Sequence, residues 1–140
     1  MIRYFTQDTA FQFHRKRLTN NWLKEVARVS GKRIGEIGII FCSDPYLLEV
    51  NRQYLGHDYY TDIITFDYCE GDLLSGDLFI SVDTVRDNAT FYGVPFEEEL
   101  HRVIVHGLLH LIGYDDHSDA DTAAMRAAEN RALALLETLR

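Results

Sequence analysis

The sequence contains few cysteines and prolines, with two of each among 140 residues. Cys42 and Cys69 lack CxxC spacing and fall in or beside apparent strands, so neither a disulfide framework nor a cysteine-rich zinc site is expected. Both thiols are predicted to be reduced and to lie in or near the core. Pro45 and Pro95 each stand where a helix is predicted to begin, so neither marks a linker between domains.

Long apolar runs are also missing. No stretch approaches the roughly 18 to 20 apolar residues that span a bilayer. The N-terminal segment, Met1-Ile-Arg-Tyr-Phe-Thr, lacks the layout of a secretory signal because charged and polar residues interrupt it at once. The hydrophobic fraction is 46% and the charged fraction 26%, as in globular proteins. We therefore expect a cytoplasmic protein without a membrane span, formed by one domain over residues 1–140.

Positive charge is scarce overall but concentrated near the N-terminus. The formal net charge is −8, which by itself disfavours a polyanionic partner. Residues 1–36 nevertheless hold eight Lys or Arg against three acids, a local charge of +5, so the rest of the chain carries −13. This polarity allows nucleic acid to bind at the basic end, although an ordinary solvated helix face explains the same pattern.

Apolar periodicity and turn residues predict a mixture of strands and helices. Strands are expected at residues 1–6, 34–42, 63–66 and 78–82, and helices at 44–55, 84–92, 96–112 and 119–139. One more helix is expected from an apolar stripe formed by Leu18, Trp22, Val26 and Val29, with Thr19 or Asn20 as its cap and Gly31 at its end. The order of the elements favours an α+β domain in which a small mixed β-sheet is covered by helices.

The segment His106-Gly-Leu-Leu-His110-Leu-Ile-Gly113 is the most informative part of the chain. Residues four apart lie on one face of a helix, so His106 and His110 can direct two imidazole nitrogens to one metal ion. Two histidines that are merely buried and hydrogen-bonded are the alternative. The surrounding residues are apolar, however, and burying two imidazoles without strong partners there costs several kcal/mol. The pattern therefore favours a metal site.

Gly113 allows the chain to leave the helix and turn back towards the histidines. One of Asp115, Asp116 and His117 is then expected to supply a third ligand. Three protein ligands and one open position are typical of catalytic zinc, in contrast to the closed four-ligand structural site. The metal site is thus predicted at the C-terminal part of a central helix and in the turn that follows it.

The class of hydrolase depends on the residue after the first histidine. Zinc proteases with the HExxH pattern carry a glutamate there as general base, whereas this chain has Gly107. The full string His106-Gly-Leu-Leu-His110-Leu-Ile-Gly-Tyr-Asp115 resembles instead the HGxLHLxGYDH signature of the YbeY family. The segment that starts Asn51-Arg-Gln-Tyr54 and ends Thr61-Asp62-Ile-Ile-Thr-Phe66 is also similar to that family, as is Gly76-Asp77-Leu-Phe-Ile-Ser81.

The resemblance implies a zinc-dependent endoribonuclease, specific for single strands, that acts in 3′-end maturation of small-subunit (16S) rRNA and in ribosome quality control. It implies one Zn²⁺ per chain, with other divalent metals as alternatives, and RNA, the small ribosomal subunit and its associated factors as partners. Asp62 and Asp77 are candidates for a catalytic base or for supporting the metal ligands. Tyr59, Tyr60 and Phe66 are candidates for stacking on bases of single-stranded RNA.

The sequence departs from the family at two positions. Leu55 replaces the family's arginine, so its phosphate-binding role would pass to Arg52 or His57 or be weaker. Asp116 stands where the family has its third histidine, and His117 follows one place later. Register favours Asp116 as the ligand, while the chemistry of small zinc sites favours His117. A metalloprotease-like hydrolase and a non-catalytic, ribosome-associated metal protein are the alternative functions.

Overall fold

A computed structural model describes residues 1–140, with four strands in the first part of the chain and three consecutive helices at its end. The strands are β1 (Ile2–Gln7), β2 (Arg33–Cys42), β3 (Ile63–Asp67) and β4 (Leu73–Ser81). The α-helices are α1 (Lys16–Val29), α2 (Asp44–Val50), α3 (Val82–Tyr92), α4 (Phe96–Ile112) and α5 (Asp119–Leu139). A π-helical turn, η1 (Asn51–Leu55), continues α2 and ends at Gly56, whose φ is +66°. No helix combines the length and the apolar character needed to cross a membrane.

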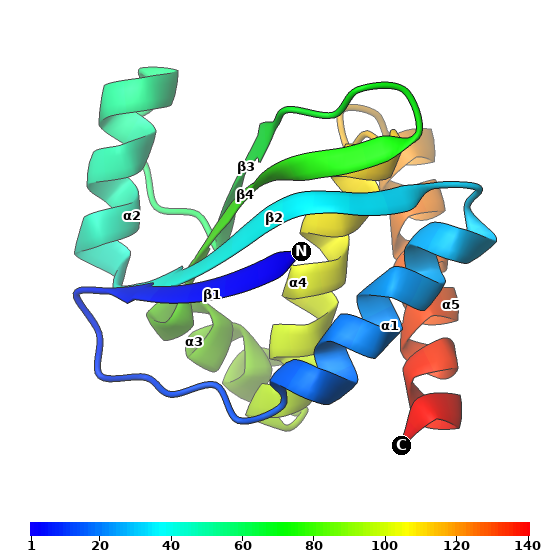
Figure 1. Ribbon diagram of the computed structural model, residues 1–140. Coiled ribbons are helices and arrows are strands. Elements are labelled where there is room, and N and C mark those ends of the chain that lie inside the picture. Colours follow the sequence, from blue (N-terminus) through cyan, green and yellow to red (C-terminus); the bar gives the residue numbers. More distant parts are fainter.

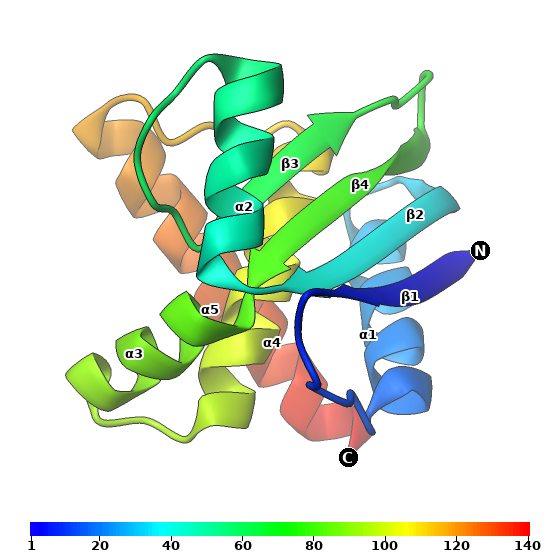
Figure 2. The ribbon, with the colours of Figure 1, turned by 90° about the vertical axis from the view of Figure 1, so that its left-hand side faces the viewer.

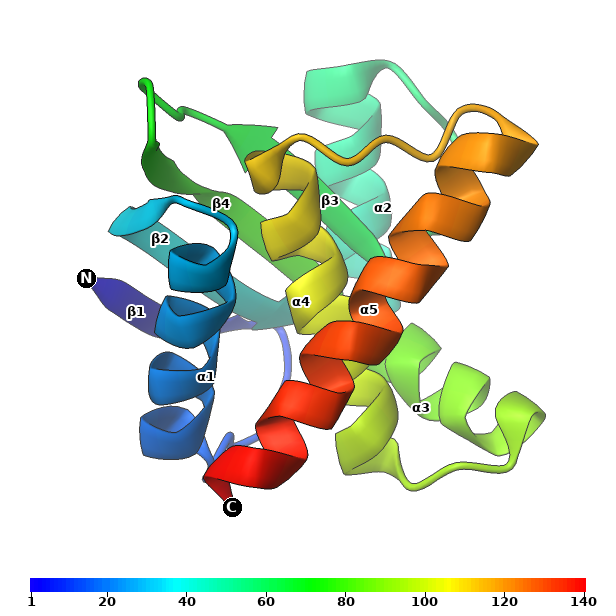
Figure 3. The ribbon, with the colours of Figure 1, turned by 90° about the vertical axis from the view of Figure 1, so that its right-hand side faces the viewer.

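The four strands form one mixed sheet in the order β1-β2-β4-β3. The first three strands in this order run parallel to one another, and β3 pairs antiparallel with β4 at the edge. One face of the sheet is covered by α4, with α1 and α5 packed beside it (Figures 1 and 3). The other face carries only α2 with η1, which lies over β3 and β4 (Figure 2). The predicted α+β class, with a small mixed sheet covered by helices, is therefore confirmed.

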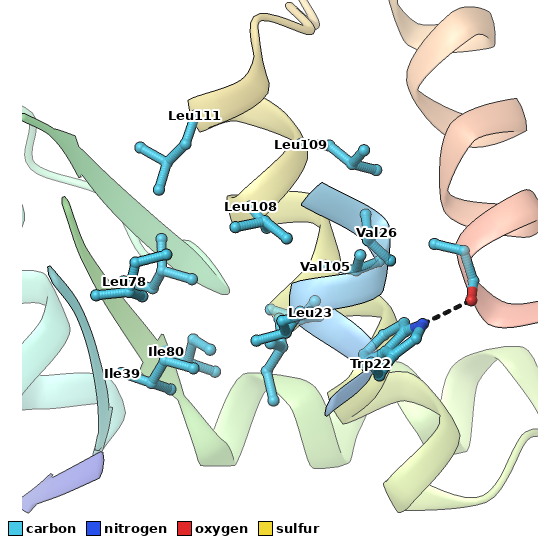
Figure 4. Packing of buried hydrophobic residues seen from close by; sticks show 14 of the residues in the cluster. Trp22, Leu23, Val26, Ile39, Leu78, Ile80, Val105, Leu108, Leu109 and Leu111 are labelled. Atoms are coloured by element: carbon cyan, nitrogen blue, oxygen red, sulfur yellow. Dashed lines mark hydrogen bonds between the residues drawn. The ribbon is translucent and has the colours of Figure 1, made fainter. Parts of the chain in front are cut away.

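The core lies between the sheet and α4. Leu78 and Ile80 of β4 face Leu108 of α4, and all three side chains are fully buried. Trp22 of α1 closes the other side of the core and donates a hydrogen bond of 2.7 Å from Nε1 to the carbonyl of Ala132 in α5 (Figure 4). Because large apolar side chains hold α4 on the sheet along its length, the polar residues of its last turns are kept in a fixed place.

Two predicted boundaries and one predicted apolar-stripe position are wrong. Helix α1 begins at Lys16, so Thr19 is not its cap but a buried interior residue whose hydroxyl lies 3.1 Å from Nε2 of His101. Val29, assigned to the apolar stripe, is 61% exposed. Strand β4 begins at Leu73 and not at residue 78, because Leu73, Leu74, Gly76 and Asp77 also pair with β2, around a register shift at Ser75. For Thr19 and for the start of β4, tertiary contacts outweighed local propensity.

Candidate metal centre

Helix α4 brings His106 and His110 together as their spacing predicts. The helix begins after Pro95 with three glutamates in its first turn, where the positive end of the helix dipole favours acids, and it ends at Gly113, whose φ is +129°. The two imidazole rings lie 4.6 Å apart between centroids, and their Nε2 atoms are separated by 3.0 Å. Both side chains are about one quarter exposed, so they open onto solvent from the end of the core.

The far nitrogen of each ring has a partner that can only accept a hydrogen bond. Nδ1 of His106 lies 2.6 Å from a carboxylate oxygen of Glu129, and Nδ1 of His110 lies 2.9 Å from the carbonyl of Tyr114. Each Nδ1 must therefore carry the proton, which leaves the two Nε2 lone pairs directed at each other. Two such lone pairs at 3.0 Å need a proton or a cation between them, so this donor pair fits a metal ion.

Asp116 completes a group of three possible ligands. Its Oδ2 atom lies 3.5 Å from Nε2 of His110 and 3.8 Å from Nε2 of His106. The three donor atoms all lie within 4.8 Å of one another. Asp116 belongs to the loop that joins α4 to α5, which passes beside the C-terminal end of α4 (Figure 3). His117 lies in the same hollow but outside this group, and which of the two residues binds the ion stays a prediction.

The donor group opens into a hollow of about 510 Å³. Its walls come from β3, from η1 and the loop after it, and from the loop after α4. Asp62, at the start of β3, lines the hollow together with Leu55, His57 and Tyr59. Asn51 holds this wall in place, because its buried amide donates a hydrogen bond of 2.9 Å to the carbonyl of Tyr59. The hollow is thus large enough for a ligand and contains several ionisable side chains.

Buried charges surround His106. Burial alone would lower the pKa of His106, but the hydrogen bond and negative charge of Glu129 more than offset this and raise it. Burial likewise opposes ionisation of Glu129, yet the hydrogen bonds from His106 and Arg102 lower its pKa overall. Burial raises the pKa of Asp62, against the opposing charge of His106. Carboxylates whose pKa is shifted by burial and a nearby charge partner, in a cleft, are candidates for functional residues.

Glu129 was not found by sequence reasoning. Its side chain is 7% exposed and joins His106 to Arg102, whose Nη1 lies 2.9 Å from the second carboxylate oxygen. A histidine ligand that donates its other N–H to a carboxylate is oriented and made more basic by it. One signal was available, since Glu129 interrupts the buried face of α5 between the buried Ala128 and Ala132. A buried acid on an apolar helix face needs a partner elsewhere.

We expect Glu129→Gln to weaken zinc binding by roughly tenfold or more, because glutamine has the same size but removes the negative charge behind His106 and replaces one of the two acceptor oxygens with a donor. Glu137→Gln is the matched control, since Glu137 lies on the same helix with its side chain 70% exposed. Competition titration against a chromogenic chelator measures both affinities. An affinity of Glu129→Gln equal to that of the control would show that Glu129 does not support the site.

The packing around Gly107 explains why no glutamate follows His106. A Cβ atom at this position would lie 2.8 Å from Cδ1 of Ile63 and 2.9 Å from Cδ2 of Leu78. The position therefore faces the sheet and not the hollow, and a glutamate there could not reach the metal ligands. Only a glycine here lets α4 pack this closely on β3 and β4, and for that reason the chain has no HExxH base at this position.

Gly107→Ala is accordingly expected to destabilise the fold by about 1–3 kcal/mol, the usual cost of overpacking a core. Urea unfolding measures the change, with an unchanged slope against denaturant. The variant Leu78→Ala provides room for the new methyl group. The double variant should thus lose less stability than the sum of the two single variants. Strict additivity would mean that Gly107 does not pack against Leu78.

The other predicted site residues lie in several places. His57 lines the hollow, and its Nδ1 is 3.0 Å from the hydroxyl of Tyr59. Arg52 does not line it, since its guanidinium pairs with Asp58 at 2.5 Å and with Glu49 at 3.7 Å. Tyr60 is 61% exposed outside the hollow.

Asp77 and Phe66 are not part of the metal centre. Both line a second hollow, on the face of the sheet that carries α2. Gly76 and Leu78 contact α4 from β4, and successive side chains of a strand point to opposite faces. The expectation that Asp77 would support the metal ligands or serve as base is therefore corrected.

Two of the basic N-terminal residues, Arg15 and Lys16, form a cluster at the opposite end of α4 from the donor group, whereas Arg33 pairs with Asp72 in the loop between β3 and β4. Arg15 forms an ion pair of 3.1 Å with Glu97 in the first turn of α4. At 1.5 Å per residue, Glu97 and His110 are roughly 20 Å apart along the helix axis. Lys16 begins α1 at this same end (Figure 1). This cluster thus lies outside the hollow that contains the metal ligands.

Comparisons with known proteins agree with the resemblance seen in the sequence. A family model described as "Endoribonuclease YbeY" matches residues 2–137. A protein of Phocaeicola vulgatus with that name is 60% identical over 97% of this chain and 99% of its own length. A namesake from Bacteroides thetaiotaomicron is 58% identical over 96% of this chain and 98% of its own. A solution structure of a Thermotoga maritima protein superposes with a TM-score of 0.70 at 27% identity, covering 97% of this chain and 89% of that one.

Proposed function

Because the chain belongs to the endoribonuclease YbeY family, we propose that it is a metal-dependent endoribonuclease that hydrolyses single-stranded RNA. The observation that carries this proposal is the convergence of His106, His110 and Asp116 on one point at the wall of an open hollow. The resemblance extends the proposal to 3′-end maturation of the small-subunit rRNA and to ribosome quality control. The small ribosomal subunit and its associated factors would then be the partners, in the cytoplasm.

Zinc is the metal that suits this donor set best. Two imidazole nitrogens and one carboxylate oxygen are zinc ligands, and a site with three protein ligands leaves one position open. When bound, the ion would lower the pKa of a water molecule and polarise a phosphoryl oxygen. Manganese and other divalent ions that accept nitrogen and oxygen ligands are the alternatives, which the metal content of the purified protein would separate.

Residues of the chain would supply the remaining chemistry. Asp62 lines the hollow beside the metal ligands and is the acid best situated to accept a proton from the attacking water. Leu55 lines the hollow where the family has an arginine, so it contributes no charge there. His57 is the remaining cation candidate in the wall, oriented by the hydroxyl of Tyr59, and would contact a phosphate. Tyr59 offers a ring for base stacking, because it is 56% exposed at the edge of the hollow.

The alternative functions differ in their substrates. A metalloprotease would need a base beside the first histidine, and the close packing of Gly107 on the sheet argues against one. Zinc-loaded protein is expected to cleave an unstructured RNA and to leave casein intact, with Asp62→Asn cleaving RNA much more slowly. Cleavage of casein alone would support the protease, and cleavage of neither would support a non-catalytic metal protein.

A further inference from the structure

The second hollow lies on the face of the sheet opposite α4, between α2 with η1 and the strands β3 and β4 (Figure 2). Its volume is about 440 Å³, within the range of small-molecule sites. Phe66 and Phe79 form its floor from adjacent strands, with ring centroids 5.7 Å apart and planes nearly perpendicular. Tyr54 and Tyr68 stand at its mouth, 67% and 59% exposed. With Tyr46, five aromatic rings therefore line one open space.

A single uncompensated carboxylate lies among these rings. Two acids line the hollow, but Glu49 is already ion-paired with Arg52 at 3.7 Å. Asp77 has no cation within ion-pair distance, and its charge, after burial, helps to raise the pKa of Tyr68. Gly38 on β2 makes room for it, since a Cβ there would lie 2.5 Å from Oδ1 of Asp77. The side chain thus lies against the sheet with no cation beside it, and the hydroxyl of Tyr68 donates a hydrogen bond to it. A carboxylate has about four lone-pair sites, so Asp77 can accept a further hydrogen bond from a ligand.

The strand β3 connects this hollow to the metal centre. As the edge strand of the sheet, it presents Thr65 and Asp67 to the hollow with the metal ligands and Phe66 to the aromatic hollow. The turn η1 is shared in the same way, with Leu55 on one side and Tyr54 on the other. A single strand of RNA lying over the β3 edge could therefore place one nucleotide at each hollow.

We propose that the aromatic hollow is a subsite for one unpaired base of the RNA, selective for bases that carry an exocyclic amino group. The rings supply stacking surfaces, which any base can use. Asp77 supplies an acceptor for an amino group, as aspartate does for N4 of cytosine. Uracil presents a carbonyl oxygen at that position and would be repelled by the carboxylate. The subsite rests on the proposed ribonuclease function, because it selects the RNA that the metal centre cleaves.

A lysine or arginine side chain from a partner protein is the other occupant that an acidic aromatic hollow accepts. The shared edge strand favours the base, because it joins the hollow to the site where RNA would be cleaved. The hollow also contains only one free negative charge, whereas basic protein segments are usually met by several.

Cytidine and uridine are the probes, since they differ at this position and neither can be cleaved. In ¹H–¹⁵N spectra of the full chain, cytidine is expected to shift the amide signals of Phe66, Tyr68 and Asp77, with roughly threefold to tenfold higher affinity than uridine. Asp77→Asn should abolish the preference, and Tyr68→Ala should weaken both nucleosides. Tyr92→Ala is the matched control, since Tyr92 is 57% exposed at the end of α3 and should change nothing.

The results that would overturn the subsite differ from those that would overturn the ribonuclease. Equal affinity for the two nucleosides, no shifts on β3 and β4, or shifts there with an arginine-rich peptide but with neither nucleoside would each overturn the subsite. RNA cleavage by the zinc-loaded protein is measured separately. If the zinc-loaded wild type does not cleave RNA, the proposed function is overturned even if cytidine binds.

Discussion

Purified His106→Ala and His110→Ala variants are expected to contain almost no divalent metal, whereas the wild type should carry about one ion per chain. Each substitution removes one of three donors whose atoms lie within 4.8 Å of one another. Two remaining donors do not hold zinc against dialysis with a mild chelator. Elemental analysis after such dialysis measures the metal content directly.

His14→Ala is the matched control for these variants, because His14 is an exposed histidine that belongs to neither α4 nor the donor group. It should keep the full metal content. RNA cleavage is expected to fall to background in both α4 variants and to be unchanged in the control. Far-ultraviolet circular dichroism separates loss of the site from loss of the fold. Full metal content in both α4 variants would show that His106 and His110 do not bind the metal.

Asp116→Ala is expected to weaken zinc binding by more than about a hundredfold, which exceeds the usual effect of removing a residue that only supports a ligand. The reason is geometric, because Oδ2 of Asp116 lies within 4 Å of both imidazole Nε2 atoms. His117→Ala should change the affinity by less than about threefold, since His117 stands outside the donor group. Zinc titration at pH 7, monitored by a competing chelator, measures both.

Asp115→Ala is the control for this pair, because Asp115 lines the same hollow and has the same charge as Asp116. A small loss in Asp115→Ala would report the general effect of removing a carboxylate near the ion. An affinity loss confined to His117→Ala would contradict the role of Asp116. It would indicate that the loop rearranges on binding to form a three-histidine site.

The histidine pair could be predicted from the sequence because it depends on local geometry alone. A spacing of four residues on a helix places two side chains on one face whatever the rest of the fold does. Gly113 likewise predicted the turn that returns the chain towards the histidines. Glu129 could not be predicted in the same way. It is 23 residues from His106 in the sequence, and the two meet only because α5 packs against α4.

Asp77 shows a different limit of prediction from the sequence. The family motif drew attention to it, but a motif does not give the face of the sheet on which a side chain lies. Leu78 and Ile80 are core residues, and strand side chains alternate, so Asp77 had to point away from α4. This alternation can be read from the sequence, because Asp77 stands between small or apolar residues of a strand. For Thr19, by contrast, the sequence gives no local indication of burial, because its buried contact is with His101, 82 residues away.

The acidic net charge, −8, is compatible with the arrangement of the site. Total charge governs long-range attraction between molecules, whereas a bound divalent ion provides local positive charge where a phosphate would lie. Of the basic residues of the N-terminal third, Arg15 and Lys16 lie about 20 Å away along α4. Whatever they contact, the phosphate nearest the cleaved bond would have to be neutralised by the ion and by His57.

One titration tests the central claim most directly. Metal-free protein is mixed with increasing zinc, and bound metal and cleavage of an unstructured RNA are measured on the same samples. Both quantities are expected to rise together and to level off at about one zinc per chain, with neither rising in His110→Ala. Full RNA cleavage by the metal-free protein, or zinc binding by the wild type without any cleavage, would contradict the account.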